Sequence, residues 1–196
     1  MLNRTNVAQR RFPRDEDGFS LIEMIVATGL LAGAVATLGQ LFAIAVANNV
    51  SSRSGSYATV LAAQKMEQLR GLAWGFDVSG LPVADLTSDT AAAVETPAGG
   101  TGLSPSPAGT LTRNTAGYVD YVDRFGRILG GGETIPPRAV FTRRWSVEPL
   151  PGSPDSLLLQ VLVTTRSNRG AADDPGSARR LPDEARLVGV RSRNAS

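Results

Sequence analysis

The sequence GFSLIEMIVATGLLAGAVATLGQLFAIAVA, residues 18–47, decides the fold of this chain. Between Leu21 and Val46 it holds 26 residues and a single charged side chain, that of Glu23. About 20 consecutive apolar residues are enough for a helix to cross the hydrocarbon core of a bilayer. The run therefore predicts a transmembrane helix, residues 19–47, that begins near Phe19.

This helix is predicted to continue well beyond the apolar run. No proline occurs between Pro13 and Pro82, and proline is the residue that most strongly interrupts a helix. An unbroken helix from Phe19 to about Trp74 would be roughly 84 Å long, which far exceeds the thickness of a membrane.

The second part of the predicted helix, residues 48–76, is amphipathic. Its apolar residues recur at helical spacing. They are Ala58, Ala62, Met66, Leu69 and Ala73, with Leu61 and Leu72 beside them. We expect this stripe to pack on a β-sheet, with Lys65, Glu67 and Arg70 on the outer side of the helix.

Glu23 is an unusual residue at the start of an apolar helix, and two interpretations are open. An ionisable group within a membrane segment is costly unless it is paired, which makes it a candidate functional residue. Alternatively, Glu23 is an interfacial carboxylate stabilised by the positive end of the helix dipole.

The residues Gly18-Phe19-Ser20-Leu21-Ile22-Glu23, followed by the apolar run, resemble the class III signal of type IV pilins and type II secretion pseudopilins. The resemblance implies that a membrane peptidase cuts between Gly18 and Phe19 and that the new amine of Phe19 is methylated. It also implies that the Glu23 carboxylate pairs with the N-terminal amine of a neighbouring subunit during assembly. The alternative is an ordinary signal anchor that is not processed in this way.

Residues 1–18 then form a cleaved leader. The leader contains Arg4, Arg10, Arg11 and Arg14, and cytoplasmic flanks of membrane helices are enriched in such residues. We therefore expect the N-terminus in the cytoplasm and the remainder of the chain outside it. Residues 15–17 are Asp-Glu-Asp, whereas many leaders of the family have Lys or Arg just before the glycine.

The composition argues against an enzyme. The chain has neither cysteine nor histidine, which excludes most transition-metal sites and nucleophiles activated by histidine. We predict no catalytic residue, no cofactor and no metal. The net charge of +2 is spread along the chain without the basic stripe that nucleic-acid binding requires.

The remainder of the chain predicts a loop followed by a small sheet. Residues 77–115 are rich in Ala, Gly, Ser, Thr and Pro, and we interpret them as a long, partly disordered surface loop. Residues 116–196 contain several segments that alternate with period two, and LLLQVLVTTRS is expected to be the central strand. The fold class is α+β: a long N-terminal helix packed on a small antiparallel β-sheet head.

Two charged motifs in the predicted sheet have alternative interpretations. In GYVDYVDRFG, Asp120 lies on one strand face with Tyr118 and Val122, and a turn is expected from Asp123 to Gly126. These two aspartates could suggest a cation site, although calcium takes about 6–8 oxygen ligands and turn chemistry explains Asp123. The dipeptide at residues 143–144, Arg-Arg, is interpreted as part of a solvated face.

The resemblance implies a structural minor subunit of a type IV pilus or related filament. The segment LAAQKMEQLRGL is similar to the helix of minor pilins of the PilV type and pseudopilins of the GspI type. The expected partners are the prepilin peptidase and methyltransferase, other pilin subunits, and inner-membrane lipid before assembly. A pseudopilin of a secretion or DNA-uptake apparatus and a membrane-anchored binding module remain alternatives.

Overall fold

The computed structural model describes residues 18–91, 99–165 and 184–193. The chain divides into two compact units, Met1–Val46 and Ala47–Ser196, and we call the second unit the head. Most of the predicted leader, residues 1–17, lies outside the described residues.

The only helix in the described ranges is α1, Leu21–Gly71. It begins after Ser20, whose carbonyl accepts the backbone N–H of Met24. Gly71 is its last residue, as expected of a glycine at a helix C-terminus. The predicted continuation to residue 76 is wrong, because Trp74–Phe76 forms strand β1 instead.

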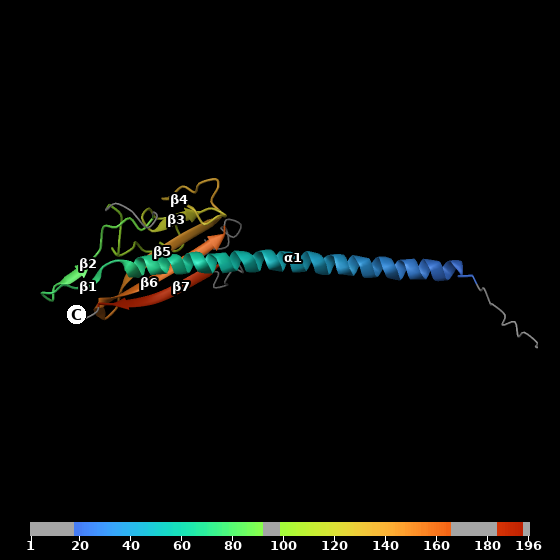
Figure 1. The fold of residues 1–196 in the computed structure, drawn as a ribbon, viewed down its shortest axis with the longest axis horizontal. Helices are drawn as coiled ribbons and strands as arrows, with labels where there is room; N and C mark the ends of the chain where they lie inside the picture. The colour runs from blue at the N-terminus through green and yellow to red at the C-terminus, as the bar shows by residue number, and fades with distance from the viewer. Residues whose placement is uncertain (1–17, 92–98, 166–183, 194–196) are drawn as a thin grey trace, which may run out of the picture. The chain divides into compact units, whose positions relative to one another are not determined.

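The head contains a five-stranded antiparallel sheet in the order β4-β3-β5-β6-β7. The strands are β3 Val119–Val122, β4 Ile128–Gly131, β5 Phe141–Leu150, β6 Ser153–Thr165 and β7 Ala185–Ser192. The apolar segment LLLQVLVTT lies in β6, an inner strand, while the middle position belongs to β5. Figure 1 shows the part of α1 within the head lying across β5, β6 and β7.

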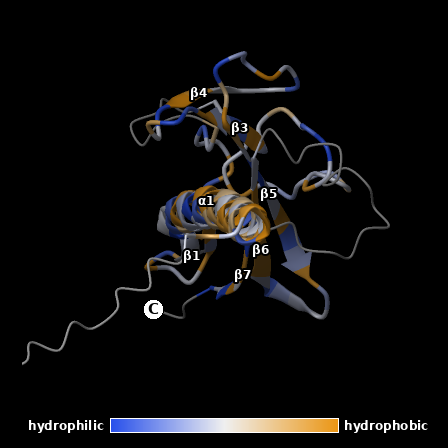
Figure 2. Ribbon diagram, turned by 90° about the vertical axis from the view of Figure 1, so that its right-hand side faces the viewer, coloured by the Kyte–Doolittle hydropathy of each residue, from blue (hydrophilic) through white to orange (hydrophobic). Residues whose placement is uncertain are grey.

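The core of the head lies between α1 and one face of this sheet. The predicted stripe supplies Ala58, Leu61, Ala62, Met66 and Leu69, and the strands supply Phe141, Trp145, Val147, Leu159, Val161 and Val163. Figure 2 looks along α1 and shows apolar residues in orange on the helix and on strands of the sheet. The prediction of a helix packed on an antiparallel sheet is confirmed, and so is the α+β class.

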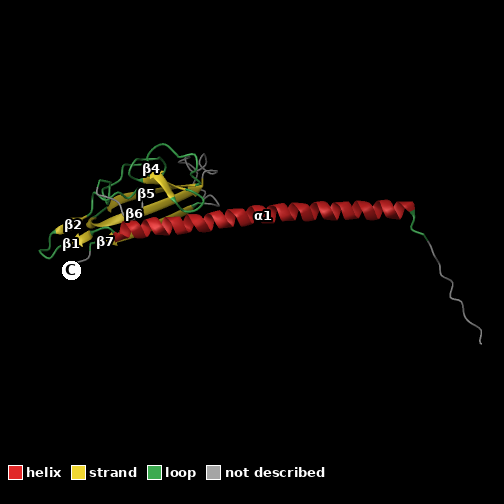
Figure 3. Cartoon of the chain, turned by 45° about the horizontal axis from the view of Figure 1, so that its top comes forward, coloured by secondary structure: helices red, strands yellow, loops and turns green. Residues whose placement is uncertain are grey.

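The interval predicted as a disordered loop, residues 77–115, contains regular structure. Strand β2, Pro82–Ala84, pairs with β1, Trp74–Phe76, in a separate two-stranded sheet. Leu103, which is 1% exposed, enters the main core. The interval is therefore anchored to the head within the described residues, because it buries an apolar side chain and pairs its backbone with β1. Figures 1 and 3 show β1 and β2 beside the end of β7.

Candidate functional site

The predicted processing site lies just ahead of α1. Gly18 and Phe19 precede the helix, and the Phe19 side chain is 80% exposed. Because the backbone on both sides of the predicted scissile bond is outside the helix, a peptidase can reach it without unwinding α1. Within the part of the chain that the structure describes, nothing covers this bond.

Glu23 lies in the first turn of α1, three residues after Ser20. Ser20 is the N-cap residue, since its carbonyl accepts the first helical hydrogen bond. A serine N-cap followed by glutamate three residues later has the spacing of a capping box. Glu23 can therefore serve helix initiation as well as an intermolecular contact, and these two roles need separate tests.

The apolar part of α1 has an exposed apolar surface. Its large side chains, from Leu21 at 80% to Val46 at 62%, are exposed along the whole run. The helix is long and apolar enough to span a membrane. An exposed apolar surface of this length is stable only in lipid or against other protein chains.

A second charged site lies between α1 and the sheet. Asp120 of β3 forms an ion pair with Lys65 of α1, with 2.8 Å between Oδ2 and Nζ. Arg143 of β5 donates to both oxygens of the same carboxylate at 2.8 Å. All three side chains are at most 2% exposed.

The cluster is tied to both elements by further hydrogen bonds. Arg143 also donates to the Leu61 carbonyl at 3.1 Å, and Lys65 donates to the Gln68 side chain and to the Thr90 carbonyl. Lys65 Nζ also lies 4.2 Å from the centre of the Trp145 ring. Each charge thus has several partners, as buried charges require.

Burial lowers the pKa of Lys65 from 10.5 to about 8, although the Asp120 carboxylate opposes this shift. The nearby Arg143 guanidinium lowers the pKa further. With two cations on one carboxylate, the cluster fixes the position of α1 on the sheet. Ion pairs of this kind are better evidence for a unique register than for high stability.

Two predictions about this site are wrong. Lys65 does not lie on the outer side of the helix, and Arg143 is not solvated. Arg144 is also buried, at 2% exposed, and donates to the Asn114 side chain at 3.0 Å. Residue type alone predicts solvent exposure for each of these charged side chains. Asp120 and Arg143 are direct neighbours in the register of β3 and β5, both on the face turned to the core.

Asp123 has the predicted turn role. Its carboxylate accepts the backbone N–H groups of Phe125 and Arg127 at 2.8 and 3.0 Å and pairs with the Arg127 side chain at 2.9 Å. Gly126, at φ 81°, supplies the left-handed residue of this turn. No group of three or more acidic or other metal-ligating side chains occurs within the described residues.

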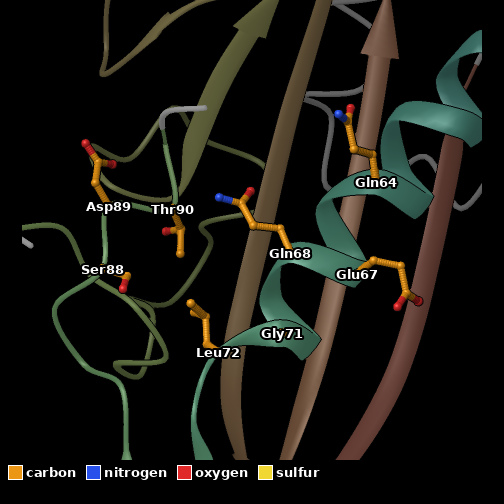
Figure 4. A pocket seen from close by; sticks show the side chains of 8 residues that line it. All are labelled: Gln64, Glu67, Gln68, Gly71, Leu72, Ser88, Asp89 and Thr90. Atoms are coloured by element: carbon orange, nitrogen blue, oxygen red, sulfur yellow. The ribbon is translucent and has the colours of Figure 1, made fainter. Parts of the chain in front are cut away.

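A groove of about 430 Å³ lies where α1 ends (Figure 4). Its walls are the last two turns of α1 and the segment at residues 88–90. Figure 4 shows Gln68 and Leu72 directed toward that segment, whereas Glu67 points to the other side of the helix. Glu67 instead pairs with Arg70 at 3.2 Å. The groove has no catalytic arrangement of side chains.

Comparison with family models, curated proteins and solved structures gives no match for this chain. Its class is therefore stated from its own features. It is an α+β protein with one long N-terminal apolar helix and an antiparallel sheet.

Proposed function

We propose that this protein is a structural minor subunit of a type IV pilus or a related filament. The observation that carries the proposal is the signal GFSLIE placed directly at the start of an exposed, apolar helix. In this proposal the prepilin peptidase removes residues 1–18 and Phe19 becomes the methylated N-terminus. The subunit waits in the inner membrane until α1 joins the helices of other subunits.

Three features support this proposal over a simple membrane anchor. An anchor needs an apolar helix, but it needs neither Glu23 nor a glycine and phenylalanine ahead of it. The amine created at Phe19 and the Glu23 carboxylate are opposite charges, and each is costly in an apolar bundle unless paired. The head carries its own core, which suits a subunit whose apolar helix changes surroundings from lipid to protein.

Mass measurement of the membrane-extracted protein tests the processing step. The expected mass is that of residues 19–196 with one added methyl group. Retention of residues 1–18 would contradict the proposal. Gly18→Phe should block the cut, since a bulky side chain beside the scissile bond replaces a hydrogen atom.

Substitutions of Glu23 test the assembly step. Glu23→Ala should leave abundance and processing normal, because removal of a charge makes membrane insertion easier. It should abolish incorporation into sheared filaments, because the amine of a neighbouring Phe19 loses its counter-charge. Glu23→Gln separates the two roles of this residue, since glutamine preserves the capping box but carries no charge.

If Glu23→Gln is excluded from filaments like Glu23→Ala, the charge is required for assembly. If Glu23→Gln is incorporated normally and Glu23→Ala is not, Glu23 acts as a helix cap and the pairing proposal is wrong. Ser20→Ala is the matched control, because it removes the N-cap side chain but leaves the Glu23 charge in place.

A further inference from the structure

Exposed large apolar side chains of the head have an uneven distribution. Outside α1 and β7, those in the described part of the head fall in only two segments. The first holds Val78, Leu81, Val83 and Leu86, and the second holds Phe125 and Val140. Val78 is fully exposed and Phe125 is 73% exposed, although neither is needed to fill the core. Apolar groups in such positions mark contact surfaces.

The two segments carry opposite charge. Residues 74–91, which we call the acidic lobe, include Asp77, Asp85 and Asp89 and no lysine or arginine. The basic lobe consists of residues 123–127 and 137–140, with the guanidinium groups of Arg124, Arg127 and Arg138. These groups line a hollow of about 710 Å³ around Phe125.

The charges of the acidic lobe are held in fixed positions. Asp77 accepts the backbone N–H groups of Ser79 and Leu81 at 2.8 and 2.9 Å. The hydroxyl and the backbone N–H of Ser88 both donate to the Asp85 carboxylate, and these hydrogen bonds lower the pKa of Asp85, which therefore stays ionised. Arg193 stacks on Trp74 at this end of the head, but its charge is paired with Asp155 at 3.1 Å.

In the basic lobe, two arginines flank the exposed aromatic ring. The guanidinium groups of Arg124 and Arg127 lie 5.7 and 5.5 Å from the centre of the Phe125 ring. Asp123 is occupied by the Arg127 side chain and by backbone donors. Arg124 and Arg138 are both exposed, and neither is paired with Asp123. The lobe therefore presents an apolar centre with positive charge around it.

The lobes lie at opposite ends of the sheet. The turn of the basic lobe follows Val122, which pairs with Phe141, and Phe141 in turn pairs with Thr165. The acidic lobe adjoins the other end, where Arg193 donates to the carbonyls of Gly75 and Val83 at 3.1 Å. One copy of the head can therefore present its basic lobe to the acidic lobe of the next copy.

We infer that the basic lobe of one copy docks on the acidic lobe of a second copy of this chain, in a head-to-tail contact. Phe125 packs among the apolar side chains around Val78, and the exposed arginines face the fixed aspartates. A head-to-tail contact leaves one free lobe at each end, so it extends into an open filament where its rotation does not close a ring. This inference rests on the proposed filament function and requires that copies of this minor subunit stand next to one another in the filament.

The lobes expose only four and two large apolar side chains, whereas stable interfaces bury about 800 Å² on each partner. The contact should therefore form where anchoring in one membrane or filament raises the effective concentration of the heads. The test accordingly uses the full chain in membranes and in sheared filaments.

The absence of cysteine allows cross-linking with single introduced thiols. Two differently tagged full-length chains are produced together, one with Arg124→Cys and one with Val78→Cys, and treated with a short bis-maleimide. The expected result is a mixed dimer several-fold more abundant than either same-site dimer. Val188→Cys replaces Val78→Cys in the matched control, because Val188 is 58% exposed but lies on β7.

A second substitution tests the chemistry of the contact. Phe125→Asp in the Arg124→Cys chain should reduce the mixed dimer to the control amount, and Phe125→Trp should preserve it. Both changes affect an exposed turn residue and leave the core intact. A mixed dimer no more abundant than the control pair overturns the inference.

Two further outcomes would also overturn it. Loss of the mixed dimer after nuclease treatment would mean that the basic lobe binds a nucleic acid that bridges the copies. Cross-linking of Arg124→Cys to a different protein, without the mixed dimer, would mean that the acidic partner is not this chain.

Processing and filament incorporation of the wild-type chain are measured in the same strain. If the wild-type chain is processed and incorporated but the cross-link does not form, only the proposed contact between the lobes is wrong. If the wild-type chain is not processed or not incorporated, the proposed function is wrong.

Discussion

Replacement of Asp120 with asparagine removes the one negative charge in the buried cluster with Lys65 and Arg143. The side chain keeps its size, so the packing of the core changes little. Two cations are left close together without their counter-charge, and both are almost completely buried. The substitution therefore isolates the electrostatic role of the carboxylate.

The expected loss of stability is large. At 2.8 Å, a pair of unit charges attract by about 6 kcal/mol at an effective dielectric constant near 20, and Asp120 makes two such pairs. Desolvation offsets much of this attraction, and removal of one partner from a buried pair typically costs about 3–5 kcal/mol. Since small domains are stable by only about 5–15 kcal/mol, Asp120→Asn should leave the head close to unfolding.

Urea unfolding of the detergent-solubilised protein, followed by tryptophan fluorescence, measures this loss. Trp145 is a suitable reporter because it is completely buried beside Lys65. The control is Glu67→Gln, which breaks the exposed pair with Arg70 and should change the free energy of unfolding by less than about 1 kcal/mol. Lys65→Met should cost less than Asp120→Asn, because Arg143 still pairs with the carboxylate.

An Asp120→Asn variant as stable as Glu67→Gln would refute this reasoning. It would mean that water or a side-chain rearrangement compensates the two cations in the folded protein. Equal losses of unfolding free energy for Asp120→Asn and Lys65→Met would also contradict it. The carboxylate would then contribute no more to stability than the Lys65 ammonium group does.

Three other outcomes are expected. Because the pKa of Lys65 is about 8 in the folded protein and about 10.5 when unfolded, the unfolded chain binds more protons between these pH values. The free energy of unfolding should therefore rise with pH over this range relative to Lys65→Met, by at most about 1.4 kcal/mol per pH unit in urea titrations. A chain that starts at Ser51 keeps the helical stripe and should be soluble with mixed α and β circular dichroism; one that starts at Gly75 should aggregate. Gly126→Val should lower the melting temperature of the head, because valine is strained at φ 81°.

The sequence was sufficient to predict the architecture of the head because its patterns are local. Alternation predicts that Tyr118 and Val122 share one strand face, and both lie in the main hydrophobic cluster, whereas Val119 and Tyr121 lie in the second cluster. Helical spacing likewise identified Ala58, Ala62, Met66 and Leu69 as core residues, although Ala73 of the same stripe is exposed beyond the end of α1. These patterns depend only on the repeat of a helix or strand.

The buried cluster was missed because its formation depends on register. In β5, Arg143 lies two residues before the buried Trp145 and therefore on the same strand face, while Asp120 shares a face with Tyr118 and Val122. The pairing of β3 with β5 then brings the two charges together, across a connection whose path the sequence does not specify. A charge on an otherwise apolar strand face is the signal that could have indicated a buried partner.

The prediction of a partly disordered loop at residues 77–115 missed strand β2 and the buried Leu103 for a related reason. Their composition is typical of disorder, but Leu103 enters the core formed by elements far away in the sequence. Composition measures what a segment can bury by itself, and here the segment is stabilised by the surface that it covers.

Lys65 is the only lysine in the sequence, and its side chain is completely inaccessible. A protease that cuts only after lysine therefore has one target, in the helix that holds the head together. It can reach that target only when α1 separates from the sheet. Where opening and closing are fast compared with cleavage, the rate of this single cut reports the population of the opened head. The rate of cleavage after Lys65 therefore measures how often α1 separates from the sheet. It can be measured on intact cells and filaments without a label.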